Sequence, residues 1–113
     1  MVGANKVCND ALCCRIENGM ATDPSQAAGP YGSIAVCDSP LSVLDKMTEK
    51  INQLRPDTLF WTGDVAPHDQ WNYSQQYVED YQTFLFDYMQ QNLSEWVTFP
   101  LEGNHDFGSV INS

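Results

Sequence analysis

Two short segments of the sequence place metal-type ligands directly after apolar runs. Asp64 follows the run 57–62, and a Gly-Asn-His-Asp segment, residues 103–106, follows the run 96–101. A carboxylate can bridge two divalent cations, and two cations about 3.5–4 Å apart can clamp a phosphoryl group and activate a water molecule. The amide oxygen of Asn104 is a neutral metal ligand. The two segments therefore predict a metal-dependent site for phosphoryl chemistry.

The two histidines of the chain are candidate proton donors. His105 follows Asn104 and is predicted to act as a general acid toward a leaving-group oxygen. His68 lies on the same predicted loop as Asp64, and it is a second proton donor or a phosphate contact. Asp106 either orients His105 or is solvated. Asp64 and His68 each have a plainer alternative, as a turn-capping carboxylate and as a surface histidine.

A strand–helix–strand unit is predicted to position these residues. Residues 57–62 form a near-continuous apolar strand, of the kind that parallel sheets bury on both faces. Ser74 is the predicted N-cap of a helix that stops near Asn92, and residues 96–101 form the second strand. Core packing explains the aromatic-rich face of the helix better than a lipid-binding surface does. That face contains Tyr77, Val78, Tyr81, Phe84, Leu85, Tyr88 and Met89. In such a βαβ unit both ligand-bearing segments lie at one edge of the sheet.

An earlier helix is predicted between Ser39–Pro40 and Arg55–Pro56. At its start a side-chain cap precedes a proline in the first turn, and at its end a proline disfavours further helix. Apolar residues recur at helical spacing and predict a core-facing stripe. The stripe consists of Leu44, Met47, Ile51 and Leu54.

Residues 1–38 contain all four cysteines, Cys8, Cys13, Cys14 and Cys37. Glycines and prolines punctuate this segment, which predicts a loop-rich structure. Four cysteines allow three disulfide pairings, and a bond between the adjacent Cys13 and Cys14 is disfavoured. Disulfides would stabilise a segment with too little apolar surface to fold alone. A thiolate zinc site is less favoured because the usual C-x2–4-C spacing is absent, and free thiols are the other alternative.

Composition limits the classes of function. The chain has 113 residues, with 15 acidic and 5 basic residues and a formal net charge of −10. This charge argues against binding nucleic acid or an anionic lipid surface through electrostatics, and it favours cations. No run of apolar residues is long enough for a transmembrane helix. The first eight residues contain no apolar stretch of the kind found in a signal peptide.

The two ligand-bearing segments resemble the second and third motifs of the calcineurin-like metallophosphoesterases, Gly-Asp and Gly-Asn-His-Asp. Further stretches resemble the acid sphingomyelinase branch of that family. These are Trp-Thr-Gly-Asp at 61–64, Pro-His-Asp-Gln-Trp at 67–71, Cys-Asn-Asp-Ala-Leu-Cys-Cys-Arg at 8–15 and Cys-Asp-Ser-Pro-Leu at 37–41. Purple acid phosphatases typically carry a tyrosine three residues after the Gly-Asp aspartate. Pro67 stands there, so that branch is set aside.

The resemblance implies roles for individual residues. It implies that Asp64 bridges two zinc ions, that Asn104 ligates the second zinc, and that His105 and His68 donate protons to the leaving oxygen. It also implies two disulfides, Cys8–Cys13 and Cys14–Cys37.

The fold that the resemblance implies is α/β, a β-sandwich flanked by helices. Residues 1–113 would be a partial domain of this kind. Residues 1–38 would be its cysteine-rich loop segment, and residues 39–113 a helix plus one βαβ unit that carries the two motifs. The Asp-x-His motif expected before Cys8 and the histidine ligands expected after Asn104 are not in this chain. We therefore expect an internal piece of a longer enzyme, inactive as an isolated fragment.

The expected function is zinc-dependent hydrolysis of a phosphodiester, such as sphingomyelin to ceramide and phosphocholine. The expected partner is a phospholipid or another phosphodiester substrate, and the expected location is extracellular or lysosomal. The sequons at Asn72 and Asn92 are compatible with a glycosylated, exported protein. The alternatives are a non-catalytic truncated paralogue or disulfide-stapled binding module, and a phosphoesterase branch that acts on nucleotides or phosphomonoesters.

Overall fold

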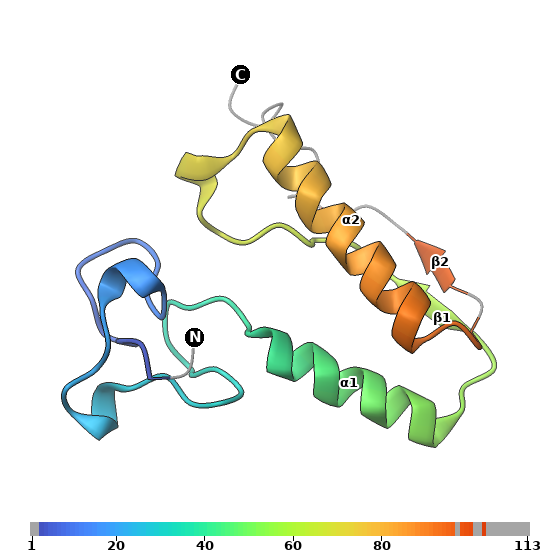
Figure 1. Ribbon diagram of the computed structural model, residues 1–113, viewed down its shortest axis with the longest axis horizontal. Coiled ribbons are helices and arrows are strands. Elements are labelled where there is room, and N and C mark those ends of the chain that lie inside the picture. Colours follow the sequence, from blue (N-terminus) through green and yellow to red (C-terminus); the bar gives the residue numbers. More distant parts are fainter. Residues whose placement is uncertain (1–2, 97, 101–102, 104–113) are drawn as a thin grey trace. The chain divides into compact units, whose positions relative to one another are not determined.

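A computed structural model of the chain describes residues 3–96, 98–100 and 103 (Figure 1). The chain divides into two compact units, residues 1–49 and residues 50–113. This division lies within a helix, whereas the sequence pattern suggested a change of character after residue 38.

The first unit is built from turns and short bridges, as predicted. Its described residues include two 3-10 turns, η1 (Ile16–Asn18) and η2 (Pro24–Gln26). The segment 3–5 is bonded on both sides, because Asn5 N donates to Gly19 O at 3.0 Å and Ala28 N donates to Ala4 O at 2.8 Å. Ala4 is completely buried at the centre of this arrangement. Backbone bonds between loops thus replace a regular sheet.

Two disulfides cross-link the first unit. Cys8 is bonded to Cys13, with their Cα atoms 5.8 Å apart, and Cys14 is bonded to Cys37, with their Cα atoms 5.5 Å apart. Cys13 and Cys14 are both buried. Of the three possible pairings the structure has the one that the family resemblance implied, and neither a thiolate zinc site nor free thiols are compatible with it.

Helix α1 (Leu41–Leu54) begins one residue after Pro40, close to the predicted start. The prediction that its apolar stripe is core was wrong for Met47 and Leu54, whose exposed fractions are 50% and 68%. The buried residue of α1 is instead Thr48, whose hydroxyl donates to Asp45 O at 2.9 Å. Helical spacing predicted which apolar residues share a face, but only Leu44 and Ile51 of that face are partly buried.

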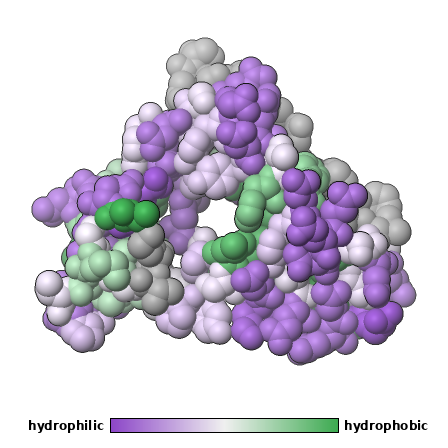
Figure 2. All heavy atoms as spheres, viewed as in Figure 1, coloured by the Kyte–Doolittle hydropathy of each residue, from purple (hydrophilic) through white to green (hydrophobic). Residues whose placement is uncertain are grey.

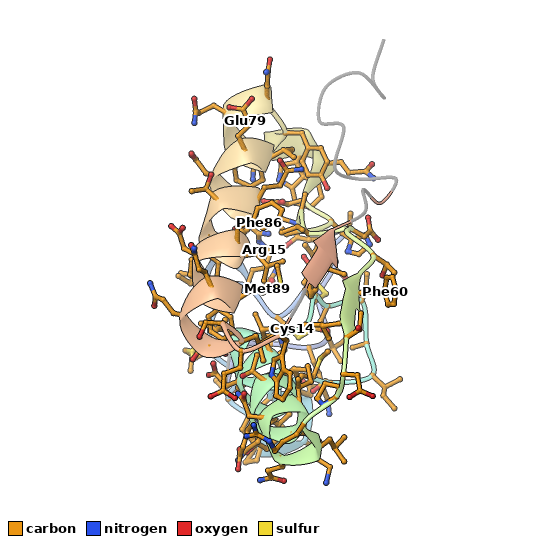
Figure 3. All side chains as sticks on the ribbon, turned by 90° about the vertical axis from the view of Figure 1, so that its right-hand side faces the viewer. Cys14, Arg15, Phe60, Glu79, Phe86 and Met89 are labelled. Atoms are coloured by element: carbon orange, nitrogen blue, oxygen red, sulfur yellow. A yellow bond between two sulfur atoms is a disulfide. The ribbon has the colours of Figure 1, made fainter. Side chains whose placement is uncertain are left out.

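The second unit contains the predicted strand–helix–strand sequence. Strands β1 (Leu59–Trp61) and β2 (Thr98–Pro100) pair in parallel, with Leu59 opposite Thr98 and Trp61 opposite Pro100. Helix α2 (Gln75–Asn92) runs alongside this pair (Figures 1 and 3). The structure is therefore of mixed helix and strand type. Its described strands form one two-stranded parallel pair, and the β-sandwich that the resemblance implied is not shown.

Strand β1 is covered on one face, which corrects the prediction that it is buried on both. Phe60 is 67% exposed, whereas Leu59 and Trp61 are partly buried. Successive side chains of a strand point to opposite faces. Figure 3 shows Phe60 projecting away from α2, so the helix shields only the other face. An apolar run reveals that a strand can be buried, but the neighbouring elements decide whether it is.

Helix α2 begins and ends as the sequence predicted. The Ser74 hydroxyl accepts the Tyr77 N–H at 3.1 Å and caps the first turn. Val78, Leu85 and Met89 are buried, but the prediction of a core face was wrong for Tyr81 and Phe84, which are 38% and 50% exposed. The face that packs on the strands is therefore narrower than the aromatic pattern indicated.

The turn after α2 is fixed to the end of α1. Asn52 donates from Nδ2 to Asn92 O at 2.9 Å and accepts from Trp96 Nε1 at 3.3 Å. The Arg55 guanidinium lies over the Trp96 ring, 5.5 Å from its centroid, and 3.5 Å from the Glu95 carboxylate. These contacts hold the chain in place just before it enters β2. On the face shown in Figure 2, hydrophilic residues predominate and apolar residues are interspersed among them.

Candidate functional site

The backbone turns sharply where β1 ends. Gly63 and Asp64 both adopt left-handed conformations, with φ of 75° and 65°. Glycine tolerates this region freely, and aspartate is one of the few other residues that enter it. A non-glycine residue held there costs on the order of 1–3 kcal/mol, and such residues cluster at functional sites. Asp64 is exposed, so its carboxylate is accessible at the carboxyl end of the strand.

Gly103 lies directly against this turn. A Cβ atom at Gly103 would be 2.6 Å from Asp64 Cβ and 2.7 Å from Asp64 Cα, closer than real atoms approach. Trp61 and Pro100 are the last paired residues of the two strands, and Asp64 and Gly103 each come third after them. The carboxyl ends of both strands therefore converge on one point.

The structure describes some of the predicted site residues and not others. Asp64 and His68 are described, while Asn104, His105 and Asp106 lie outside the described residues. The close approach of Gly103 brings the beginning of the Gly-Asn-His-Asp segment to Asp64. It does not give the positions of the side chains that follow.

His68 is exposed and lies on the loop between β1 and α2. Its backbone carbonyl accepts the Gln70 N–H at 2.9 Å, which begins the 3-10 turn η3 (Gln70–Asn72). We refer to residues 66–73 as the histidine loop. Asp64 and His68 thus lie on one connection, with the carboxylate at the strand end and the imidazole farther along it.

Asp69, next to His68, is a residue whose importance the sequence did not reveal. It is completely buried, and its Oδ2 accepts the Tyr77 hydroxyl at 2.6 Å and Asn72 Nδ2 at 3.0 Å. Burial raises the pKa of the Tyr77 phenol above its ordinary value of 10.0, and the hydrogen bond to Asp69 raises it further. The nearest signal in the sequence was its place in the Pro-His-Asp-Gln-Trp stretch, which assigned it no role.

The donor types available fit a hard or borderline cation. Zinc accepts carboxylate oxygen ligands, and Asp64 is an exposed residue with a carboxylate at a strand end. Among residues 3–96, 98–100 and 103, no three His, Cys, Asp or Glu side chains are grouped as a metal site. Of the two predicted ligands, this part of the chain contributes Asp64, so the complete ligand set remains a proposal.

Both sequon asparagines lie at the surface of the second unit, and both amides already donate. Asn72 Nδ2 donates to Asp69, and Asn92 Nδ2 donates to Tyr88 O at 2.8 Å. Each residue is nevertheless exposed.

Within the described residues, neither helix combines the length and the apolar character that crossing a membrane requires.

Comparison with known proteins connects this site to one group of enzymes. No protein-family model matches the sequence. The chain is 30% identical to the human (Homo sapiens) sphingomyelin phosphodiesterase over 112 residues, which are 98% of this chain and 18% of that protein. It is 31% identical to sphingomyelin phosphodiesterase 1 of Caenorhabditis elegans over 110 residues, which are 94% of this chain and 18% of that protein.

A shorter match has a higher identity. Sphingomyelin phosphodiesterase B of Dictyostelium discoideum is 40% identical over 72 residues, which are 61% of this chain and 11% of that protein. The chain thus spans less than a fifth of the length of the curated relatives that it matches. Over nearly all of its own length, it is a homologue of one segment of the sphingomyelin phosphodiesterases.

Proposed function

We propose that this chain is a segment of a zinc-dependent phosphodiester hydrolase of the sphingomyelin phosphodiesterase type. The observation that carries the proposal is the approach of Gly103 to Asp64, which joins the starts of two metal-ligand motifs at one sheet edge. In open α/β sheets this edge is where ligands bind. The similarity to sphingomyelin phosphodiesterases over 98% of the chain supports the choice of reaction.

The proposed roles follow from the chemistry of each side chain. The carboxylate of Asp64 and the amide oxygen of Asn104 would hold the zinc. When bound, zinc polarises the phosphoryl group and promotes attack by water. His105 and His68 donate a proton to the oxygen that leaves phosphorus. A water oxygen forms the new bond to phosphorus as the bond to the leaving alkoxide breaks, so sphingomyelin would yield ceramide and phosphocholine.

The proposed substrate and location follow from the similarity to the sphingomyelin phosphodiesterases. The substrate is sphingomyelin or a related phosphodiester, and the location is extracellular or lysosomal. Two disulfides suit an oxidising compartment, and the exposed Asn72 and Asn92 sequons suit glycosylation there. We further propose that the isolated 113-residue chain is inactive, because a catalytic zinc site needs about three protein ligands per ion.

The test is substitution of Asp64 in the longest natural chain that contains this segment. Hydrolysis of sphingomyelin and of bis(4-nitrophenyl) phosphate should fall about 100- to 1,000-fold in Asp64→Asn, because a charge that stabilises the transition state is lost. Zinc content by mass spectrometry should fall in parallel. The control is Asp57→Asn, an exposed carboxylate before β1 that should change neither quantity. Unchanged turnover and zinc content in Asp64→Asn would refute the proposed role.

A binding function is the second candidate. It is favoured by the first unit, where disulfides hold a structure that exposes Ile34 and Val36. For this candidate the natural protein would show no zinc-dependent turnover of either substrate, and Asp64→Asn would leave its properties unchanged.

A further inference from the structure

Asp69 combines complete burial with a formal negative charge. It is the largest fully buried side chain among the described residues, and it directly follows His68. Burying a carboxylate is strongly unfavourable unless hydrogen bonds compensate for the lost water. The structure therefore depends on the groups that donate to it.

Two groups that donate to Asp69 come from different parts of the second unit. The Tyr77 hydroxyl belongs to the first turn of α2, and Asn72 Nδ2 belongs to η3. Their distances to Asp69 Oδ2 are 2.6 and 3.0 Å. Hydrogen bonds to an ionised acceptor are shorter and about twice as strong as neutral ones. Through Tyr77, the carboxylate joins the histidine loop to a helix.

Other bonds hold the histidine loop in one shape. The Tyr73 hydroxyl donates to Pro67 O at 2.5 Å, and Asn72 N donates to Asp69 O at 2.8 Å. The ring of Tyr73 also lies 6.1 Å from that of Tyr77. His68 therefore lies between two fixed points, with the Pro67 carbonyl bonded on one side of it and the Asp69 side chain bonded on the other.

We propose that Asp69 is a positioning residue, whose buried carboxylate fixes the position of His68 by fastening the histidine loop to Tyr77. The catalytic part of this inference rests on the proposed function, since it gives His68 a substrate to act on. Asp69 itself touches no substrate. Its carboxylate is turned into the protein and engaged by Tyr77 and Asn72, while His68 remains exposed.

The experiment compares Tyr77→Phe, Asp69→Asn and the double variant in the longest natural chain that contains this segment. Tyr77→Phe removes one hydroxyl and keeps the ring, so it stays informative if Asp69→Asn fails to fold. The matched controls are Tyr31→Phe, a half-exposed tyrosine of the first unit, and Asp87→Asn, an exposed aspartate of α2.

The first readout is hydrogen–deuterium exchange of peptides that cover residues 66–73. Exchange there should accelerate about 10- to 100-fold in each single variant, which is the expected effect of losing a hydrogen bond to a charged group. The double variant should add little to either single one, because Tyr77→Phe removes the donor and Asp69→Asn removes the charge of the acceptor in the same hydrogen bond. The controls should match the wild type. Unchanged exchange in Tyr77→Phe would overturn the proposal.

The second readout is steady-state hydrolysis of sphingomyelin. The kcat value should fall by at least about tenfold in Tyr77→Phe while KM stays within about twofold, because a displaced proton donor affects the chemical step. Faster exchange with unchanged kcat, in a protein that Asp64→Asn inactivates, would overturn the positioning role. If the wild type hydrolyses no phosphodiester, the proposed function fails, while the exchange data still decide whether Asp69 anchors the loop.

Discussion

Gly103 and Asp64 are in contact through their backbones, each three residues beyond the last paired residue of its strand. A Cβ atom at Gly103 would also lie closer to Asp64 N than real atoms approach. The requirement for glycine arises from the neighbouring Asp64. This relationship fixes how closely the two motif-bearing segments approach.

Gly103→Ala should destabilise the second unit by about 1–3 kcal/mol, the usual cost of forcing a methyl group into occupied space. Urea unfolding followed by tryptophan fluorescence measures this, because all three tryptophans lie within residues 50–113. Ser94→Thr, which adds a methyl group at an exposed position, is the control and should stay within about 0.5 kcal/mol of the wild type. Equal stability of the two variants would contradict the contact.

Asp64→Gly should stabilise the second unit by about 0.5–1 kcal/mol while it abolishes zinc-dependent turnover. The left-handed conformation at φ 65° strains aspartate, and the relief of that strain exceeds the entropy that glycine adds to the unfolded chain. Urea unfolding and the hydrolysis assay together test this trade-off. In Asp57→Gly, where the native φ is not positive, only the entropy cost applies, so stability should fall. A loss of stability in Asp64→Gly would show that the conformation is not strained.

The stability of the second unit should decline at alkaline pH because of Tyr77. Its pKa is raised in the folded state by burial and by Asp69, so the folded protein holds this proton more tightly than the unfolded chain. The stabilisation is therefore fully present below pH 10.0, the ordinary value, and is lost as the pH rises above it. Urea unfolding between pH 9 and about 11 should show a steeper decline for the wild type than for Tyr77→Phe. Tyr31→Phe should follow the wild type, and parallel curves for all three would refute the assignment.

Loss of Cys14–Cys37 should destabilise the first unit more than loss of Cys8–Cys13. The two bonds close loops with sequence separations of 23 and 5. Chain entropy alone gives about 3 kcal/mol for the longer loop and about 2 kcal/mol for the shorter one. Hydrogen exchange within residues 3–40 of the two double cysteine-to-serine variants measures the difference. The reverse order of protection would show that strain or local contacts outweigh loop length.

Local rules predicted much of the second unit. The Ser74 cap, the end of α2 near Asn92 and the parallel order of β1 and β2 all follow from short-range chemistry and chain connectivity. Burial was harder to predict. Periodicity shows which side chains share a face, but Met47 and Phe60 remain exposed because exposure depends on what packs against that face.

In the candidate site, too, local features could be predicted from the sequence, while long-range contacts could not. Asp64 was predicted as a site residue because it is a carboxylate that follows a strand. Its left-handed backbone and its contact with Gly103 depend instead on how two distant segments meet. Asp69 was missed because an aspartate in a polar loop resembles many solvated ones. In the folded chain it is buried and accepts a hydrogen bond from Tyr77, eight residues later, which no spacing rule predicts.

The adjacency of Cys13 and Cys14 determines how the chain responds to a protease. A single cut between residues 8 and 37 leaves the two pieces joined through one disulfide or the other, at every peptide bond but one. The exception is the bond between Cys13 and Cys14, because each lies in a different covalent ring. That bond is buried, and the N–H groups of both residues are engaged, by Val36 O at 2.7 Å and by Asn5 O at 2.8 Å. Nicked molecules of this segment therefore stay in one piece until they are reduced.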